Sequence, residues 1–148
     1  MATALAQAPA AHHSALDDSA YADVEAAVAA LADGGDEGAA RARLLGFIDE
    51  HPACAEAHND LGVLTYQAGD LLAAREAIDR AIALHPDRPR YHRNRALVLL
   101  AGGEVEPALM ALARSLLLDP TDEETLKIVA DLEAARRQSQ GDAFTFPV

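Results

Sequence analysis

The sequence contains no tryptophan, one cysteine and few aromatic residues, which make up only 4% of its 148 residues. The single cysteine, Cys54, cannot form a disulfide within the chain, so the fold does not depend on internal cross-links. Scarce aromatics argue against a β-sandwich, whose strands favour aromatic and β-branched side chains. Alanine and leucine carry much of a hydrophobic fraction of 51%, which indicates closely packed helices.

Positive charge is also scarce, because 12 Lys and Arg residues face 24 Asp and Glu residues and give a formal net charge of −12. We therefore expect no nucleic-acid partner and no attraction to an anionic membrane surface. The sequence lacks an apolar run of the ~20 residues that a membrane-spanning helix needs. It also lacks the basic start of a secretory signal. These absences predict a cytoplasmic protein without membrane insertion.

A repeat organises the chain. Glycine, alanine and proline each recur with one shared spacing, at Gly35, Gly69 and Gly103, at Ala40, Ala74 and Ala108, and at Pro52, Pro86 and Pro120. A period of about 34 residues, with glycine between two apolar stripes and proline after the second, is typical of stacked helix pairs. We expect seven helices, at 21–33, 37–50, 55–68, 71–84, 89–101, 104–118 and 121–138.

Local sequence features refine this interpretation. In the middle unit, small residues at Gly62, Ala74 and Ala81 predict that its two helices lie antiparallel and close together. The segment from Thr121 to Glu124 has the pattern of a capping box at the start of the last helix.

The unit at 55–88 resembles a tetratricopeptide repeat, and the positions that carry the resemblance are Leu61, Gly62, Gly69, Ala74, Ile78, Ala81 and Pro86. It departs from the family pattern at His58 and at Thr65, where the family favours an aromatic residue and Tyr66 is the neighbour. The resemblance covers about residues 21–138. It implies an all-α fold, a right-handed α-solenoid of three repeats at 21–54, 55–88 and 89–122, with a C-terminal capping helix at 121–138. We interpret residues 1–20 as a disordered N-terminal tail and residues 139–148 as a C-terminal tail.

The resemblance also implies a concave groove, lined by set positions on the first helix of each repeat and on the capping helix. In this sequence the expected groove residues are Glu56, Asn59, Asp60, Val63, Tyr66, Arg90, Arg93, Asn94, Leu97, Leu100 and Lys127. One family subtype uses such positions to clamp the C-terminal carboxylate of chaperones. Glu25, Ala29 and Asp60 replace the Lys and Asn residues of that clamp and only Arg90 fits, so we exclude this mode.

We expect each part of the groove to contact a partner peptide in its own way. Val63, Tyr66, Leu97 and Leu100 would supply apolar contacts, and the amide of Asn59 would pin the peptide backbone. Four of the twelve basic residues lie between 88 and 95 and include Arg90 and Arg93, which predicts recognition of acidic groups. In the alternative interpretation, these arginines pair with the chain's own acids.

These features predict a non-enzymatic adaptor that binds a partner peptide or helix and needs no cofactor. Two alternatives remain. The protein could self-assemble by placing its Phe144–Val148 tail in a neighbour's groove. It could also be an accessory unit of a separate enzyme, because the AEAHNDLG segment at 55–62 resembles repeats that precede bacterial glycosyltransferase domains.

Weaker motifs could indicate chemistry. Cys54 and His58 are four residues apart near a helix start, but no oxyanion hole or third orienting group accompanies them, so we predict no catalytic site. His12 and His13 lack a third ligand, and the histidines at 51, 58, 85 and 92 follow the period of the repeat, which favours packing and helix-end roles over a metal site.

Overall fold

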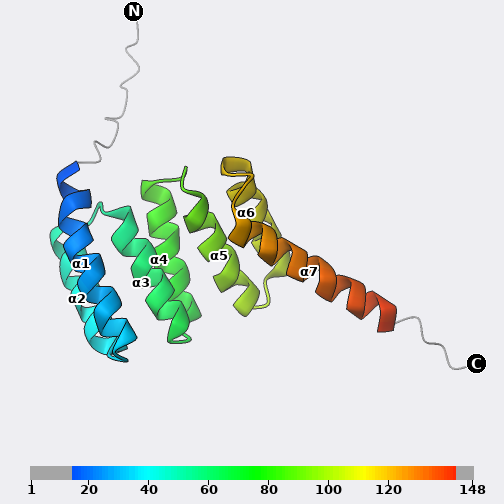
Figure 1. Cartoon of the computed structure of the whole chain (residues 1–148), viewed down its shortest axis with the longest axis horizontal. Helices are drawn as coiled ribbons and strands as arrows, with labels where there is room; N and C mark the ends of the chain where they lie inside the picture. Colours follow the sequence, from blue (N-terminus) through cyan, green and yellow to red (C-terminus); the bar gives the residue numbers. More distant parts are fainter. Residues whose placement is uncertain (1–14, 143–148) are drawn as a thin grey trace, which may run out of the picture. The chain divides into compact units, whose positions relative to one another are not determined.

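The computed structural model describes the backbone of residues 15–142 and the side chains of residues 20–139. Within these residues the chain forms seven helices and no strand (Figure 1). The helices are α1 (Ala15–Asp33), α2 (Glu37–Glu50), α3 (Ala55–Gln67), α4 (Leu71–Leu84), α5 (Pro89–Ala101), α6 (Val105–Leu118) and α7 (Glu123–Asp142). The predicted all-α repeat fold is confirmed.

The chain divides into two compact units after Cys54. The first unit contains α1 and α2, which pack against each other through Val28, Leu44 and Phe47, with the rings of Tyr21 and Phe47 5.3 Å apart. Helix α1 begins at Ala15 rather than at the expected residue 21, so residues 15–20 are helical. Of the tail predicted at 1–20, residues 1–14 lie outside the described residues.

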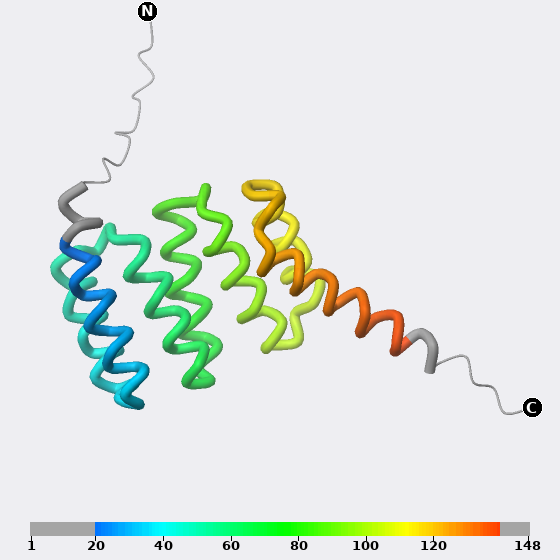
Figure 2. The backbone as a smooth tube through the Cα atoms, in the orientation of Figure 1, coloured from blue at the N-terminus to red at the C-terminus, as the bar shows by residue number. Residues whose placement is uncertain are grey.

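The second unit stacks the pairs α3–α4 and α5–α6 and adds α7 (Figure 2). Helix α5 packs on both α3 and α4, and α7 packs on α6. Two small clusters fill the space between the pairs, one of Ala74, Ile78 and Val98 and one around Tyr91. A larger cluster, made of Ala96, Leu99, Ala108, Ala111 and Leu112, lies under α7.

The turn inside each helix pair has the same geometry. Gly35, Gly69 and Gly103 adopt φ values of 80°, 83° and 77°, a region that residues with a Cβ rarely enter. The next residue in each turn donates its N–H back into the first helix, as Asp70 does to the Thr65 carbonyl at 3.0 Å. The repeated glycines therefore mark the turns that the sequence predicted.

The expected close approach of α3 and α4 is present at Gly62. A Cβ built on this glycine would lie 2.4 Å from Ile78 Cγ1 and 3.1 Å from the Ala74 carbonyl oxygen. Ala74 and Ala81 are fully buried in the same unit. The small residues at these positions let the two helices touch nearly backbone to backbone, which fixes α3 against α4.

The start of α7 differs from the predicted capping box. Thr121 donates its hydroxyl to Asp119 and does not cap the helix. Asp122 precedes the first helical residue, and its carboxylate accepts a hydrogen bond from the Thr125 hydroxyl at 2.6 Å. A capping box on Thr121 is therefore wrong, because Asp119 holds the Thr121 hydroxyl and the helix begins one position later than such a cap requires.

No helix within the described residues is long and apolar enough to cross a membrane.

Candidate functional site

A pocket of about 200 Å³ opens between α3, α4 and α5. Four of the expected groove residues line it, namely Val63 and Tyr66 from α3 and Asn94 and Leu97 from α5, and Gln67, Ile78 and Val98 complete the lining. Ile78 and Val98 are buried and form part of the core between the helix pairs. The pocket is thus an opening onto the core, with an apolar interior and two side-chain amides in its lining. We call it the α3–α5 pocket.

Asn59 does not have the exposed position that the predicted peptide contact requires. Its side chain is 1% exposed, and its Oδ1 accepts a hydrogen bond from Asn94 Nδ2 at 2.8 Å. Its own Nδ2 donates to Asp60 Oδ1 at 3.0 Å. The Asn59 amide therefore joins α3 to α5 and is buried, whereas Asn94 is half-buried and lines the pocket.

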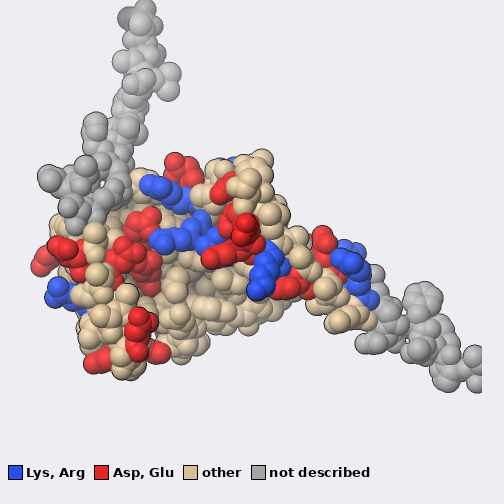
Figure 3. Space-filling view, viewed as in Figure 1, with Lys and Arg blue, Asp and Glu red and all other residues tan. Residues whose placement is uncertain are grey.

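The arginines of α5 pair with acids of the same chain. Arg90 forms a salt bridge with Glu56 on α3 and lies 3.7 Å from Asp60. Arg93 Nη1 binds the Asp122 carboxylate at 2.6 Å, and its Nη2 binds Glu124 at 2.8 Å. Figure 3 shows Lys and Arg side chains gathered over α5, with Asp and Glu side chains over α3 and over the start of α7.

This pairing follows the repeat register. Glu56, Arg90 and Glu124 occupy equivalent positions of the repeat, so successive first helices carry charges of alternating sign at one position. A third arginine of the cluster, Arg95, donates its Nε to Asp79 at 2.7 Å. These three arginines are paired with acids of the chain, as in the alternative interpretation, and they link neighbouring helices.

The Asp122 carboxylate is the best-enclosed charge among these pairs. Burial acts to raise the pKa of this carboxyl, but hydrogen bonds from Thr125 and Arg93, together with the charge of Arg93, outweigh it and lower the pKa. Thr125 also lies 3.1 Å from the Ser115 hydroxyl, which donates to the Pro89 carbonyl. A polar network therefore fastens α7 to α5 and α6.

Tyr91 supports the junction between α3 and α5. The side chain is 1% exposed, and burial, helped by a hydrogen bond and the negative charge of Glu56, raises the pKa of its hydroxyl. The hydroxyl therefore stays protonated.

Leu100 and Lys127 are two further expected groove residues that do not line the α3–α5 pocket. Leu100 packs against the cluster of Ala96, Leu99 and Leu112 together with side chains from α7. Lys127 is exposed on α7. The apolar contact surface is consequently shorter than expected and is centred on Val63, Tyr66 and Leu97.

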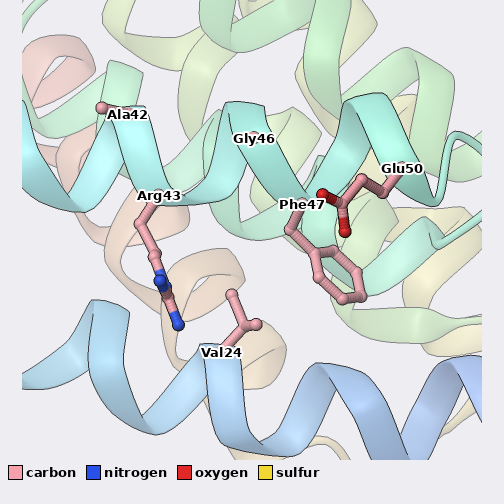
Figure 4. A pocket seen from close by; sticks show the side chains of 6 residues that line it. All are labelled: Val24, Ala42, Arg43, Gly46, Phe47 and Glu50. Atoms are coloured by element: carbon pink, nitrogen blue, oxygen red, sulfur yellow. The ribbon is translucent and has the colours of Figure 1, made fainter.

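The first unit contains another pocket, of about 340 Å³, that the sequence interpretation did not predict (Figure 4). Ala42 and Gly46 leave space on α2 opposite Val24, and the Arg43 side chain extends from α2 toward α1. Small residues four apart on one helix face were the available signal. Because Arg43 and Glu50 bring opposite charges to its lining, the pocket does not define one ligand chemistry.

The weaker chemical motifs gain no support from the described residues. Cys54 is 1% exposed, so its sulfur is out of reach of a substrate. Within the described part of the chain, no three His, Cys, Asp or Glu side chains come together as metal ligands. His12 and His13 lie outside the described residues, as does the Phe144–Val148 segment.

Stacked helix pairs with glycine turns and a pocket on their first helices define an all-α helical repeat protein. The family model described as tetratricopeptide repeat matches residues 25–77 and 66–123, which together span more than half of the sequence. The chain belongs to the tetratricopeptide repeat family.

Similar proteins extend well beyond the matched region. A TPR repeat-containing thioredoxin of Arabidopsis thaliana, TTL4, is 37% identical over 60 residues, which cover 40% of this chain and 9% of that protein. A mutant O-GlcNAc transferase of Thermobaculum terrenum superposes with a TM-score of 0.68 at 27% identity, over 76% of this chain and 22% of that chain. This chain therefore spans less than a quarter of either protein.

A third match has nearly the length of this chain. The first TPR of Spaghetti (RPAP3), solved with the HSP90 peptide SRMEEVD, superposes with a TM-score of 0.71 at 16% identity, over 77% of this chain and 90% of that one. At this identity the likeness concerns the fold alone.

Proposed function

We propose that this chain is a protein-interaction module that binds a segment of another protein across α3 and α5. The observation that carries the proposal is the α3–α5 pocket, whose apolar interior is formed by Val63, Tyr66 and Leu97 and whose amides, Gln67 and Asn94, can meet a peptide backbone. The peptide-bound structure of a TPR with the same fold supports this use of the helix pairs. We assign the chain no catalytic role.

The size of the pocket favours a peptide side chain over a free small molecule. Pockets for small molecules usually enclose ~300–1,000 Å³, whereas this one encloses about 200 Å³. One large aliphatic or aromatic side chain fills such a space, and the rest of the partner segment would lie on the helix surface. A micromolar dissociation constant, about −8 kcal/mol, is the expected affinity for a contact of this kind.

The paired arginines change the partner that we expect. A carboxylate approaching Arg90 must compete with Glu56 and Asp60, and one approaching Arg93 must compete with Asp122 and Glu124. Acidic groups of the partner would therefore add little to the affinity, and its apolar anchor decides binding.

Photo-crosslinking from the pocket tests the proposal. A photoreactive amino acid replaces Gln67, which is exposed and lines the pocket. The matched control carries it at Ala83, which is exposed on α4 and absent from the pocket lining. We expect a product in the source lysate from position 67 only, and mass spectrometry then identifies the crosslinked segment.

The dissociation constant of a synthetic peptide with that sequence, measured on variants of this chain, shows which residues contribute to binding. Leu97→Gln should weaken binding at least tenfold, since about 1.4 kcal/mol of apolar contact is lost. Arg90→Ala should change it by less than about threefold, because Arg90 is already paired. Equal binding by wild type and Leu97→Gln would disprove the pocket as the binding site.

A second candidate function is a targeting module for an enzyme. It is favoured by the 27% identity to the Thermobaculum terrenum O-GlcNAc transferase over 76% of this chain. Under this hypothesis the protein crosslinked from position 67 is a glycosyltransferase or its substrate. Identification of a partner unrelated to glycosyl transfer would dismiss it.

A further inference from the structure

Exposed large apolar side chains concentrate at one end of the second unit. Five of the seven such residues among the described side chains lie on α6 and α7, and only Leu45 and Leu72 lie elsewhere. The five are Val105, Leu109, Met110, Leu117 and Leu126. Met110 and Leu117 are 75% and 72% exposed, so nothing in the unit covers them.

The α6 residues share one face of their helix. At about 100° per residue, Val105, Leu109, Ala113, Leu117 and Met110 occupy an arc of about 140°, next to the stripe that α6 buries. Glu106 is the acid within that arc. An exposed helix face of this kind is usually polar, so its apolar character needs an explanation.

The equivalent helix of the preceding repeat, α4, has charged residues at three of the positions that form the apolar face of α6. In the repeat register, Leu109, Met110 and Ala113 correspond to Arg75, Glu76 and Asp79 on α4. In α4, Arg75 and Asp79 make ion pairs, Arg75 with Glu104 and Asp79 with Arg95. The repeat register therefore does not require apolar residues at 109 and 110, whereas Val105 and Leu117 correspond to the apolar Leu71 and Ala83 of α4.

The apolar face continues into a groove between α6 and α7. A pocket of about 220 Å³ is lined by Val105 and Leu109 from α6 and by Val129, Leu132, Glu133 and Arg136 from α7. Helix α7 extends past the other helices of this unit (Figure 1), and residues 133–139 are all exposed. In a solenoid the element that covers such a groove is another helix.

The charged residues around this face indicate what kind of partner surface can pack against it. Four exposed charged residues lie within or beside this face, Glu106 inside the arc of α6 and Arg114, Glu133 and Arg136 next to it, and they are two acids and two bases with no net charge. The whole chain carries −12, so most of its surface repels a second copy of itself. Two-fold association places one patch against the same patch, which is favourable when the charges of that patch have mixed sign and no net excess.

We propose that the face formed by Val105, Leu109, Met110, Leu117 and Val129, here called the α6–α7 face, binds the same face of a second copy of this chain. The dimer would cover Met110 and Leu117 and leave the α3–α5 pocket open, because no residue belongs to both. The proposal does not depend on the function proposed for that pocket.

Sedimentation equilibrium of the full chain over a concentration series tests the proposal. The wild type should shift from the monomer mass to twice that mass. Met110→Lys with Leu117→Lys should weaken self-association at least tenfold without loss of helical circular dichroism, because both side chains are exposed. Leu72→Lys, a matched change at a residue 70% exposed on α4, should leave self-association unchanged.

Charge reversal adds a test that does not involve apolar residues. Arg136→Glu gives the four charged positions of the face a net charge of −2 and Glu133→Arg gives them +2, so each variant alone should associate more weakly. An equal mixture of the two should restore association through a mixed dimer.

The proposal fails if the wild type stays monomeric at every concentration, or if Leu72→Lys weakens association as much as the lysine pair does. It also fails if deletion of residues 143–148 abolishes association, since the C-terminal tail would then be the contact.

Discussion

The helix pairs α3–α4 and α5–α6 are successive copies of one backbone pattern, yet they differ in three respects. Gly62 crosses Ile78 in the first pair, whereas Ala96 stands at the equivalent position of the second. Asp70 caps α4, whereas Glu104 precedes α6 without a side-chain cap. Helix α4 presents charges to its successor, whereas α6 presents apolar residues.

The comparison separates the residues of a repeat that determine its backbone from those that join it to the next repeat. The features that make the backbone, which are the turn glycines and the small residues at helix crossings, recur with the period. The side chains that join one helix pair to the next vary. Both the binding and the self-association proposed above depend on the variable positions, while the recurring positions keep the backbone constant.

A substitution at the crossing of α3 and α4 should have the largest effect on the free energy of unfolding. Gly62→Ala places a Cβ 2.4 Å from Ile78 Cγ1 and must push α3 and α4 apart. We expect a loss of up to about 3 kcal/mol in the free energy of unfolding, more than the ~1 kcal/mol by which alanine favours a helix. Urea unfolding followed by circular dichroism measures this loss.

Two reference variants separate packing from helix propensity. Gly46→Ala on α2 meets no atom within 4 Å and should stabilise by about 0.5–1 kcal/mol. Ala96→Gly should cost about 2 kcal/mol, since it removes a buried methyl group and weakens the helix. If Gly62→Ala raised stability as Gly46→Ala does, the two pairs would not differ in how closely their helices cross.

A substitution in the ion pair that attaches α7 to α5 should have the next largest effect on the free energy of unfolding. Asp122→Asn breaks the ion pair with Arg93 and should lower the free energy of unfolding by about 2 kcal/mol, because hydrogen bonds to a charged group are lost. The pair between Glu56 and Arg90, which links α3 to α5, is more exposed and should contribute only ~0–1 kcal/mol. Thermal unfolding of Asp122→Asn and Glu56→Gln compares the two junctions.

The pH dependence of this junction has a definite sign. The pKa of the Asp122 carboxyl is lower in the folded chain than in the unfolded one, so its contribution is present above the unfolded pKa of about 3.9. The contribution is lost as pH falls through the folded pKa. The free energy of unfolding should therefore fall less on acidification in Asp122→Asn than in the wild type. Asp131→Asn, at an exposed position of α7, should show the same fall as the wild type.

The backbone of the repeats was largely predictable from sequence because it depends on local residue types at a fixed spacing. Helices α2, α3, α4 and α5 begin at the expected residue, α6 begins one residue later, and Gly62 has the predicted packing role. The start of α1 at Ala15 was missed because an alanine-rich segment without a clear apolar stripe gives no periodic signal.

The site was predictable only in part, for a physical reason. Val63, Tyr66 and Leu97 were expected to share one surface, and they line one pocket because apolar side chains at these positions of α3 and α5 face each other. The partners of Arg93 and Asn59 could not be predicted because Asp122 and Asn94 lie 29 and 35 residues away in the sequence. With twice as many acids as bases in the chain, the sequence offers each arginine several possible partners and does not select one.

Substitutions at the residue that precedes the second helix of each pair should have the smallest effect on the free energy of unfolding. The Asp70 carboxylate accepts the Ala73 N–H at 3.1 Å, as Asp36 accepts that of Ala39 in the first unit. Glu104, which takes the place of Asp70 in the next repeat, makes no such cap and instead accepts a hydrogen bond from Arg75 at 3.1 Å. Asp70→Ala should therefore cost about 1 kcal/mol, and Glu104→Ala only ~0–1 kcal/mol.

Glu104→Asp sharpens this comparison because it shortens the side chain to the length that caps α4. The variant should gain a cap of about 1 kcal/mol while losing an exposed ion pair, and so should be at least as stable as the wild type. Urea unfolding of the three variants under one buffer condition checks the order. A loss for Glu104→Ala as large as that for Asp70→Ala would mean that Glu104 already caps α6 in solution, and that the two pairs begin their second helices alike.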